Sequence, residues 1–254
     1  MNDGVLMQKP VGLMVEKILR LAGRPLRMIP SSMRMRVPFG INRGFLWIRG
    51  SANAPEWLGV YEHGKQRVLR RILSRGQTVC DIGANAGFYT LGMARMVGPG
   101  GRVIAFEPLP ANLGKIRRHL EINKIDNVTL CSCALSDENG ATAFDVGEND
   151  FTGRISEKAK DGFEVRTISL DEFISHERVV DPTFLKIDVE GAEAKVLAGA
   201  RALIQRAHPS MLIALHGRQA ALDCYHILRE AGYVVKGLNG VEVKTSIPAE
   251  ILAV

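Results

Sequence analysis

The sequence predicts an α/β protein with a doubly wound, mostly parallel sheet, an N-terminal helical extension and an inserted hairpin and loop. From residue 77 onward, short apolar runs alternate with amphipathic stretches, and this alternation is typical of parallel strands joined by right-handed crossovers. The runs are too continuous for half-exposed strands, so we expect them to be buried on both faces. With 254 residues and 46% hydrophobic composition, the chain can bury one full core.

The predicted strands are five apolar runs, at residues 77–83, 101–108, 127–135, 183–190 and 210–217. The third run, NVTLCSCAL, would place Cys131 and Cys133 on one face of the sheet if it formed a single strand. The four cysteines of the chain lack the spacing of metal ligands, so we expect buried free thiols in a reduced compartment. Since the start of the chain does not resemble a signal peptide, the expected location is the cytoplasm.

Amphipathic stretches predict helices at residues 110–123, 191–207 and 218–233. The first opens with Pro110, a residue that favours the first helical position. The second stretch places apolar residues on one helical face, namely Val196, Leu197, Ala200, Leu203 and Ile204. Residues 138–174 interrupt the alternation with glycines and a polar middle, and we interpret them as the inserted hairpin and loop.

Basic residues concentrate near the N-terminus. Residues 1–75 hold 14 Lys and Arg against 4 Asp and Glu, whereas the rest of the chain carries a net charge of −4. We therefore divide the chain into a basic, partly helical extension, 1–50, and a folded domain, 51–254. Aromatic residues make up only 6% and are not interleaved with the arginines, which argues against nucleic-acid binding.

The extension contains an amphipathic stretch, VGLMVEKILRLAG, at residues 11–23. A helix there would lie on an anionic membrane surface and give the protein a peripheral membrane contact. Alternatively, its apolar face packs on the body of the protein or on a second subunit, so an oligomer is also compatible with the pattern. The chain has no run of 18 apolar residues, and no membrane span is predicted.

A glycine-rich turn, within VCDIGANAGFYT at residues 79–90, follows the first predicted strand. Such a turn is either merely tight or lets a ligand approach the main chain. In open α/β sheets, ligands bind at the carboxyl ends of strands near the switch point, where this turn lies. The second strand ends on Glu107, 20 residues after Gly87, and an acid at this place accepts hydrogen bonds from ribose hydroxyls. Together these features predict a nucleoside-containing cofactor.

A nicotinamide nucleotide is one candidate, but its G-x-G-x-x-G fingerprint is incomplete here. In GANAGF, Asn85 replaces the second glycine and no residue matches the third. Asp81, two residues before Gly83, suits a cation better than a pyrophosphate. S-adenosylmethionine, a sulfonium with an amino-acid tail, fits these groups better. An oxidoreductase and a non-catalytic binding domain are the alternatives, although the second would not need the strand-end carboxylates Asp188 and Glu190.

The chain also resembles a known family from about Trp57 to His216. The segments that carry the resemblance are WLGVYEHGKQRVLRRILSRGQTVCDIGANAGFYTLGMA, GRVIAFEPLPANLGKI, CALSDENG, TISLDEF and FLKIDVEGAEAKVLAGA. In this order they are similar to the FkbM-type methyltransferases. The resemblance implies a class I, Rossmann-like methyltransferase fold and S-adenosylmethionine-dependent O-methylation, commonly of a sugar or polyketide hydroxyl. The expected acceptor is thus a small molecule or a glycan.

Chemistry and resemblance together suggest roles for the turn and its neighbours. Gly83, Asn85 and Gly87 would shape the methionine end of the cofactor site, and Asp81 would orient the ammonium group. Glu107 would bind the ribose. The alternatives are a turn-capping carboxylate at Asp81 and a solvated strand-end acid at Glu107.

Two further pairs are weaker candidates. Ala134 and Leu135 follow the third strand and would flank the adenine, or they belong simply to the core. Tyr61 and Glu62 precede the sheet on a predicted helix that would cover the cofactor, or that packs on an edge of the domain.

Candidate catalytic groups follow the fourth and fifth strands. A hydroxyl is a poor nucleophile unless its proton leaves during attack, so a general base is expected. Asp188 and Glu190 in KIDVEGAE and His216 in IALHG stand at strand ends that face the methyl group. Glu193 would begin the next helix and interact with its dipole, a structural role. Whether a metal takes part is left open by the sequence.

Overall fold

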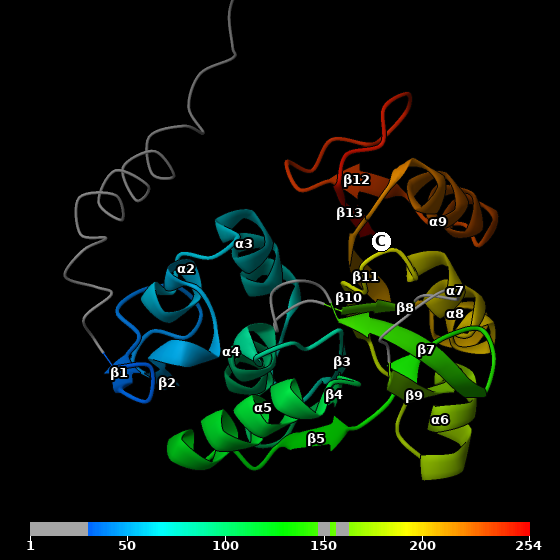
Figure 1. Ribbon diagram of the computed structural model, residues 1–254. Helices are drawn as coiled ribbons and strands as arrows, with labels where there is room; N and C mark the ends of the chain where they lie inside the picture. Colours follow the sequence, from blue (N-terminus) through cyan, green and yellow to red (C-terminus); the bar gives the residue numbers. More distant parts are fainter. Residues whose placement is uncertain (1–29, 147–152, 156–162) are drawn as a thin grey trace, which may run out of the picture.

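The computed structural model describes residues 30–146, 153–155 and 163–254. Within these residues, a seven-stranded sheet forms the centre of the molecule (Figure 1). Its strands, in spatial order, are β12 (Val235–Gly237), β13 (Glu250–Ala253), β11 (Ser210–Ala214), β10 (Phe184–Ile187), β3 (Thr78–Ile82), β4 (Arg102–Phe106) and β5 (Val128–Cys131). The strands from β11 to β5 are parallel, and β13 runs antiparallel to both of its neighbours. The prediction of a mostly parallel, doubly wound sheet is confirmed.

Helices cover both faces of the central sheet (Figure 1). One face carries α3 (His63–Ile72), α4 (Phe88–Val97) and α5 (Pro110–Asn123), and the other carries α6 (Leu170–Glu177), α7 (Glu193–Ala198), α8 (Arg201–Ala207) and α9 (Arg218–Glu230). Successive strand residues alternate between the two layers. Val79 and Val103 pack with the first group of helices, while Cys80 and Ile104 pack with the second. The strands are therefore buried on both faces, as their continuous apolar runs predict.

Two predicted elements are divided in the structure. The run 127–135 gives β5 and then β6 (Ala134–Leu135), which leaves the central sheet and pairs with β9 (Phe163–Ile168). Cys131 and Cys133 therefore do not share a strand, although all four cysteines are free thiols. The stretch 191–207 forms α7 and α8, separated at Gly199, where a Cβ atom would overlap the carbonyl oxygen of Ser136. The apolar face predicted for this stretch is buried all the same.

The inserted segment contributes to a second, smaller sheet. Its described strands are in the order β6, β9, β7 (Gly140–Val146) and β8 (Gly153–Ile155). β7 pairs antiparallel with both β8 and β9, so the predicted hairpin exists. It is part of a sheet that continues from the end of β5 through β6.

The described part of the N-terminal extension packs closely on the body of the protein. β1 (Arg34–Arg36) and β2 (Leu46–Ile48) form a hairpin, followed by a short 3₁₀ turn, η1 (Arg49–Ser51), and by α2 (Ala54–Leu58). Trp47 is fully buried and stacks on His119 of α5 with ring centroids 4.0 Å apart. The amphipathic stretch 11–23 lies outside the described residues. None of the helices in the described ranges combines the length and hydropathy that a bilayer-spanning segment needs.

We predict that Trp47→Ala lowers the free energy of unfolding by about 3–5 kcal/mol, the usual cost of removing a large buried aromatic side chain. Denaturant unfolding measures the change. Phe39→Ala, at a side chain that is 59% exposed nearby in the chain, is the control and should have little effect. Equal losses in the two variants would show that the segment around Trp47 does not contribute to the core.

Candidate active site

A pocket opens at the carboxyl ends of β3, β4 and β10, the place that the sequence predicts for a cofactor. Of the predicted site residues, its lining includes Gly83, Asn85, Glu107, Ala134, Leu135, Asp188 and Glu190. The remaining ones, Glu62, Asp81, Gly87 and His216, lie behind or beside the lining. Because β6 supplies Ala134 and Leu135, the second sheet forms one wall of this pocket.

The glycine turn is both tight and open to the pocket. Gly83 has φ +79°, and a Cβ atom there would overlap the carbonyl oxygen of Asp188 on the neighbouring strand end. Gly87, with φ +89°, caps the N-terminus of α4. Asn85 also has a positive φ, 51°, and it faces the pocket. The turn therefore needs Gly83 for chain packing, and it still presents main chain to a ligand.

Glu107 holds this turn in place from the end of β4. One carboxylate oxygen, Oε2, accepts a hydrogen bond from the backbone N–H of Asn85 at 2.8 Å, and the other accepts from the N–H of Leu109 at 2.9 Å. The side chain is only 4% exposed, so the alternative of a solvated strand-end acid does not hold. Burial raises the pKa of Glu107 more than these hydrogen bonds lower it. Oε1 also accepts from the side-chain amide of Asn112 at 3.4 Å. A carboxylate oxygen has about two acceptor positions, so Oε2 can still accept from a ligand hydroxyl.

Asp81 is fully buried and already paired within the protein. It accepts a hydrogen bond from the hydroxyl of Thr90 at 2.6 Å and lies 3.1 Å from Nζ of Lys186. The same ammonium group donates to the carbonyl oxygen of Gly83 at 2.9 Å. Asp81 is thus positioned behind the turn, and direct contact with a ligand ammonium stays a prediction.

A second buried lysine, Lys65 of α3, joins three carboxylates from different elements. Its Nζ lies 2.7 Å from Glu62, 3.3 Å from Asp188 and 3.3 Å from Glu250. Glu62 is not inside a helix as expected: it caps α3 in a left-handed conformation, and Tyr61 lies in the preceding turn and lines the pocket. The other oxygen of Glu62 accepts from the hydroxyl of Tyr89 at 2.7 Å.

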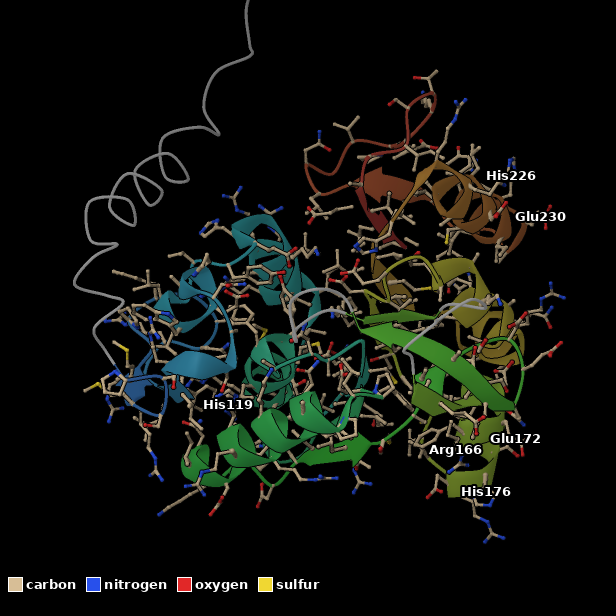
Figure 2. All side chains as sticks on the ribbon, in the orientation of Figure 1. His119, Arg166, Glu172, His176, His226 and Glu230 are labelled. Atoms are coloured by element: carbon tan, nitrogen blue, oxygen red, sulfur yellow. The ribbon has the colours of Figure 1, made fainter. Side chains whose placement is uncertain are left out.

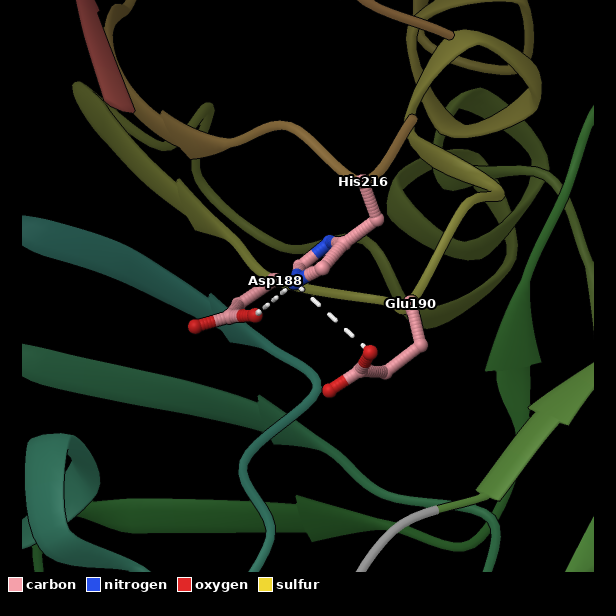
Figure 3. Close-up of side chains that lie close together, drawn as sticks. All are labelled: Asp188, Glu190 and His216. Carbon is pink, nitrogen blue, oxygen red and sulfur yellow. Dashed lines mark ion pairs between the residues drawn. The ribbon is translucent and has the colours of Figure 1, made fainter. Parts of the chain in front are cut away.

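The three predicted catalytic side chains lie together, as Figure 3 shows. Nε2 of His216 is 3.7 Å from Oδ1 of Asp188 and 3.6 Å from Oε2 of Glu190. On the other side of the ring, Nδ1 lies 2.7 Å from Oε1 of Glu193, which is fully buried. Two loops, one after β10 and one after β11, therefore bring a histidine and three acids to one edge of the pocket.

The surrounding charges lower the pKa of Asp188 and raise the pKa of His216. Burial alone would raise the pKa of Asp188, but Lys186, Lys65 and His216 outweigh it and lower that pKa. The hydrogen bond to Glu193 is the main reason that the pKa of His216 is raised, against the opposing effect of burial. The lowered pKa favours the anionic form of Asp188, and the raised pKa favours the protonated form of His216.

Asp188, Glu190 and His216 each offer one donor atom, and these atoms lie within 4.8 Å of one another. Such a set resembles a divalent-cation site in its ligand types. The ammonium groups of Lys65 and Lys186 lie 3.3 Å and 3.9 Å from the other oxygen of Asp188. These two lysines are themselves paired with further acids, Glu62, Glu250 and Asp81, so they leave this edge of the pocket with no excess of positive charge.

Sequence reasoning missed both buried lysines. Lys186 lies inside the apolar run FLKI, and a single lysine in a fully buried strand was the signal that could have revealed it, since lysine is almost never buried unpaired. Lys65 lies in the basic segment before β3, where the sequence gives no such signal. Glu193 does begin α7 as predicted, but its contact with His216 was not anticipated.

The comparison with known families agrees with this geometry. The profile described as "Methyltransferase FkbM domain" matches residues 81–235, from Asp81 at the glycine turn to the start of β12. The chain belongs to this family. It is a methyltransferase of the FkbM type, and the strand order of its sheet gives it the class I, Rossmann-like fold. The family assignment replaces the oxidoreductase alternative.

Individual relatives are distant. The hexuronic acid methyltransferase AglP of Haloferax volcanii is 26% identical over 171 residues, which cover 66% of this chain and 69% of that protein. The 31-O-demethyl-FK506 methyltransferase FkbM of Streptomyces tacrolimicus is 28% identical over 200 residues, covering 64% and 75%. Among solved structures, Methyltransferase FkbM from Methylobacillus flagellatus KT has a TM-score of 0.49 and 19% identity. That alignment covers 80% of this chain and 55% of the other.

We predict that Lys186→Met lowers the free energy of unfolding by about 3–5 kcal/mol, because it leaves the buried Asp81 without a counter-charge. Thermal and denaturant unfolding measure the loss. Lys195→Met, at an exposed position of α7, is the matched control. Adding Asp81→Asn to Lys186→Met should recover part of the stability. A loss no larger than that of the control would show that the buried pair does not hold the turn.

Proposed function

We propose that this protein is an S-adenosylmethionine-dependent O-methyltransferase that methylates a hydroxyl group of a sugar-containing or other secondary-metabolite acceptor. The observation that carries the proposal is the position of two different acidic sites in one pocket. Glu107 follows β4, the strand end at which we expect the ribose, and the group of Asp188, Glu190 and His216 follows the strands β10 and β11.

The pocket fits the cofactor in its donor and acceptor chemistry. Glu107 retains acceptor capacity for ribose hydroxyls, and Ala134 and Leu135 give a small, apolar surface for the adenine. The acids around Asp188 suit a group with a positive charge. When bound, S-adenosylmethionine supplies an electrophilic methyl group on its sulfonium sulfur. The residues of the chain then have to hold the hydroxyl oxygen in line with that methyl group and accept its proton.

The acceptor class is supported by the names of two relatives, which describe methylation of a hexuronic acid and of 31-O-demethyl-FK506. The second name specifies an oxygen atom, and a hexuronic acid is a sugar acid with hydroxyl groups beside its carboxyl group.

We predict that Glu107→Ala weakens S-adenosylmethionine binding by roughly 1.5–3 kcal/mol, the range for hydrogen bonds to a charged group. Titration calorimetry of the full chain measures the affinity. Glu121→Ala, at an exposed acid of α5, should bind as the wild type does. Because Glu107 also holds the glycine turn, the melting temperature of each variant is measured alongside, and Glu107→Gln serves as a less disruptive variant. Folded Glu107 variants with unchanged affinity would remove this residue from the cofactor site.

We also predict that His216→Ala and Asp188→Asn each lower kcat at least tenfold, since a positioned base contributes roughly 10²–10⁴-fold. Methyl transfer to the true acceptor is the assay. The control is His226→Ala, at an exposed position of α9 (Figure 2). Removing His216 also leaves Glu193 without its partner, so His216→Gln is included to retain a polar side chain. If folded variants at both positions turn over at the wild-type rate, these strand ends supply no base.

A further inference from the structure

Glu193 and His216 form a short contact between a fully buried carboxylate and an imidazole ring. The Glu193 side chain is fully buried at the start of α7, where its Oε1 lies 2.7 Å from Nδ1 of His216 and accepts from the N–H of Gly191 at 3.0 Å. Its second oxygen is buried and has no hydrogen-bond partner among the described residues. The imidazole ring is thus the principal polar partner of a carboxylate that has no access to water.

This contact determines which ring nitrogen faces the pocket. When the carboxylate of Glu193 is ionised, it can only accept hydrogen bonds, and Nδ1 of His216 then carries the hydrogen. The other nitrogen, Nε2, then presents its lone pair toward Asp188 and Glu190, both of which line the pocket. Asp188 and Glu190 lie beyond hydrogen-bond distance of Nε2, so neither one fixes the ring.

We propose that Glu193 is a positioning residue for methyl transfer: it fixes the tautomer and orientation of His216 and stabilises the ring after Nε2 has taken the proton of the acceptor hydroxyl. The inference rests on the proposed function. In the step, the O–H bond breaks and its proton moves to Nε2. The hydroxyl oxygen forms a C–O bond to the methyl carbon, and the C–S bond breaks with its electron pair on sulfur.

The charges around His216 favour its protonated form after the transfer. Glu193 faces the ring from α7, and Asp188 and Glu190 face it from the loop after β10. The opposing cations are Lys65 of α3 and Lys186 of β10, which contact Asp188, while Glu250 of β13 shares Lys65. Lys65 also pairs with Glu62, and Lys186 with Asp81, so six acids lie around the two lysines and the imidazole. The raised pKa of His216, due first to the Glu193 hydrogen bond, agrees with this balance.

The test removes the charge of the Glu193 side chain and keeps its shape. In Glu193→Gln, the side-chain amide can donate a hydrogen bond to Nδ1, which allows the tautomer with hydrogen on Nε2. In that tautomer, Nε2 cannot take the proton of the substrate hydroxyl. We expect kcat to fall at least tenfold while the affinity for S-adenosylmethionine is unchanged. The acid limb of the kcat–pH profile should move to lower pH, since the imidazolium loses its stabilising anion. Glu193→Asp should restore part of the rate. Glu230→Gln, at an exposed position of α9 (Figure 2), is the matched control.

Nitrogen-15 NMR of the histidine rings in EDTA-containing buffer gives a readout that needs no acceptor. In the wild type, the neutral form of His216 should carry its hydrogen on Nδ1, and Glu193→Gln should shift that balance toward Nε2. A wild-type ring protonated on Nε2, or a folded Glu193→Gln variant with unchanged kcat and pH profile, would overturn the proposal. If the spectra agree but the protein transfers no methyl group to any hydroxyl acceptor, the proposed function fails while the control of the His216 tautomer by Glu193 stands.

Discussion

A buried ammonium group, Nζ of Lys186, connects the two strand ends on which the site is built. Lys186 lies in β10 and pairs with Asp81 of β3. It also donates to the carbonyl oxygen of Gly83 in the turn and lies 3.9 Å from Asp188, which follows β10. The turn can lie against the carbonyl group of Asp188 because Gly83 has no side chain. A buried charge is costly unless it is paired and hydrogen-bonded, so these contacts hold the turn and the strand ends in one arrangement.

The remaining charges of the site follow from this arrangement. Oδ2 of Asp188 lies near the ammonium groups of Lys65 and Lys186, and Oδ1 lies on the side of His216. Glu193 then holds the far side of the imidazole. The acids at the strand ends therefore differ in their partners: Asp188 contacts two lysines, whereas Glu193 contacts the histidine. On the opposite wall, Glu107 fixes the glycine turn from β4. Glu107 and the group around His216 thus lie at different strand ends beside one pocket.

The buried strands, the start of α5 and the residues at the strand ends could be predicted because local sequence patterns encode them. The continuous apolar runs gave the order of buried strands, and Pro110 marked the start of α5, since both depend on neighbours in the sequence. The positions of Glu107, Asp188 and His216 also followed, because parallel strands end at one edge of the sheet. The roles predicted for Asp188, Glu190 and His216 stay predictions, although the three side chains lie close together.

The features that were missed depend on contacts between distant segments. The break at Gly199 arises from the carbonyl of Ser136, and the division of residues 127–135 arises from pairing with β9. Lys65 acquires its role only when α3 lies against β10 and β13, and Glu193 only when His216 lies beside α7. Contacts between segments that are distant in the sequence leave no local pattern, so the periodicity of the sequence could not reveal them.

The most direct test is to locate the methyl group of the bound cofactor. We would bind S-adenosylmethionine labelled with carbon-13 at its methyl group and record nuclear Overhauser effects to the histidine ring protons. Contact with the ring of His216, and none with that of the exposed His226, is the predicted result. Saturating binding with the methyl group remote from His216, or no binding at all, would contradict the account.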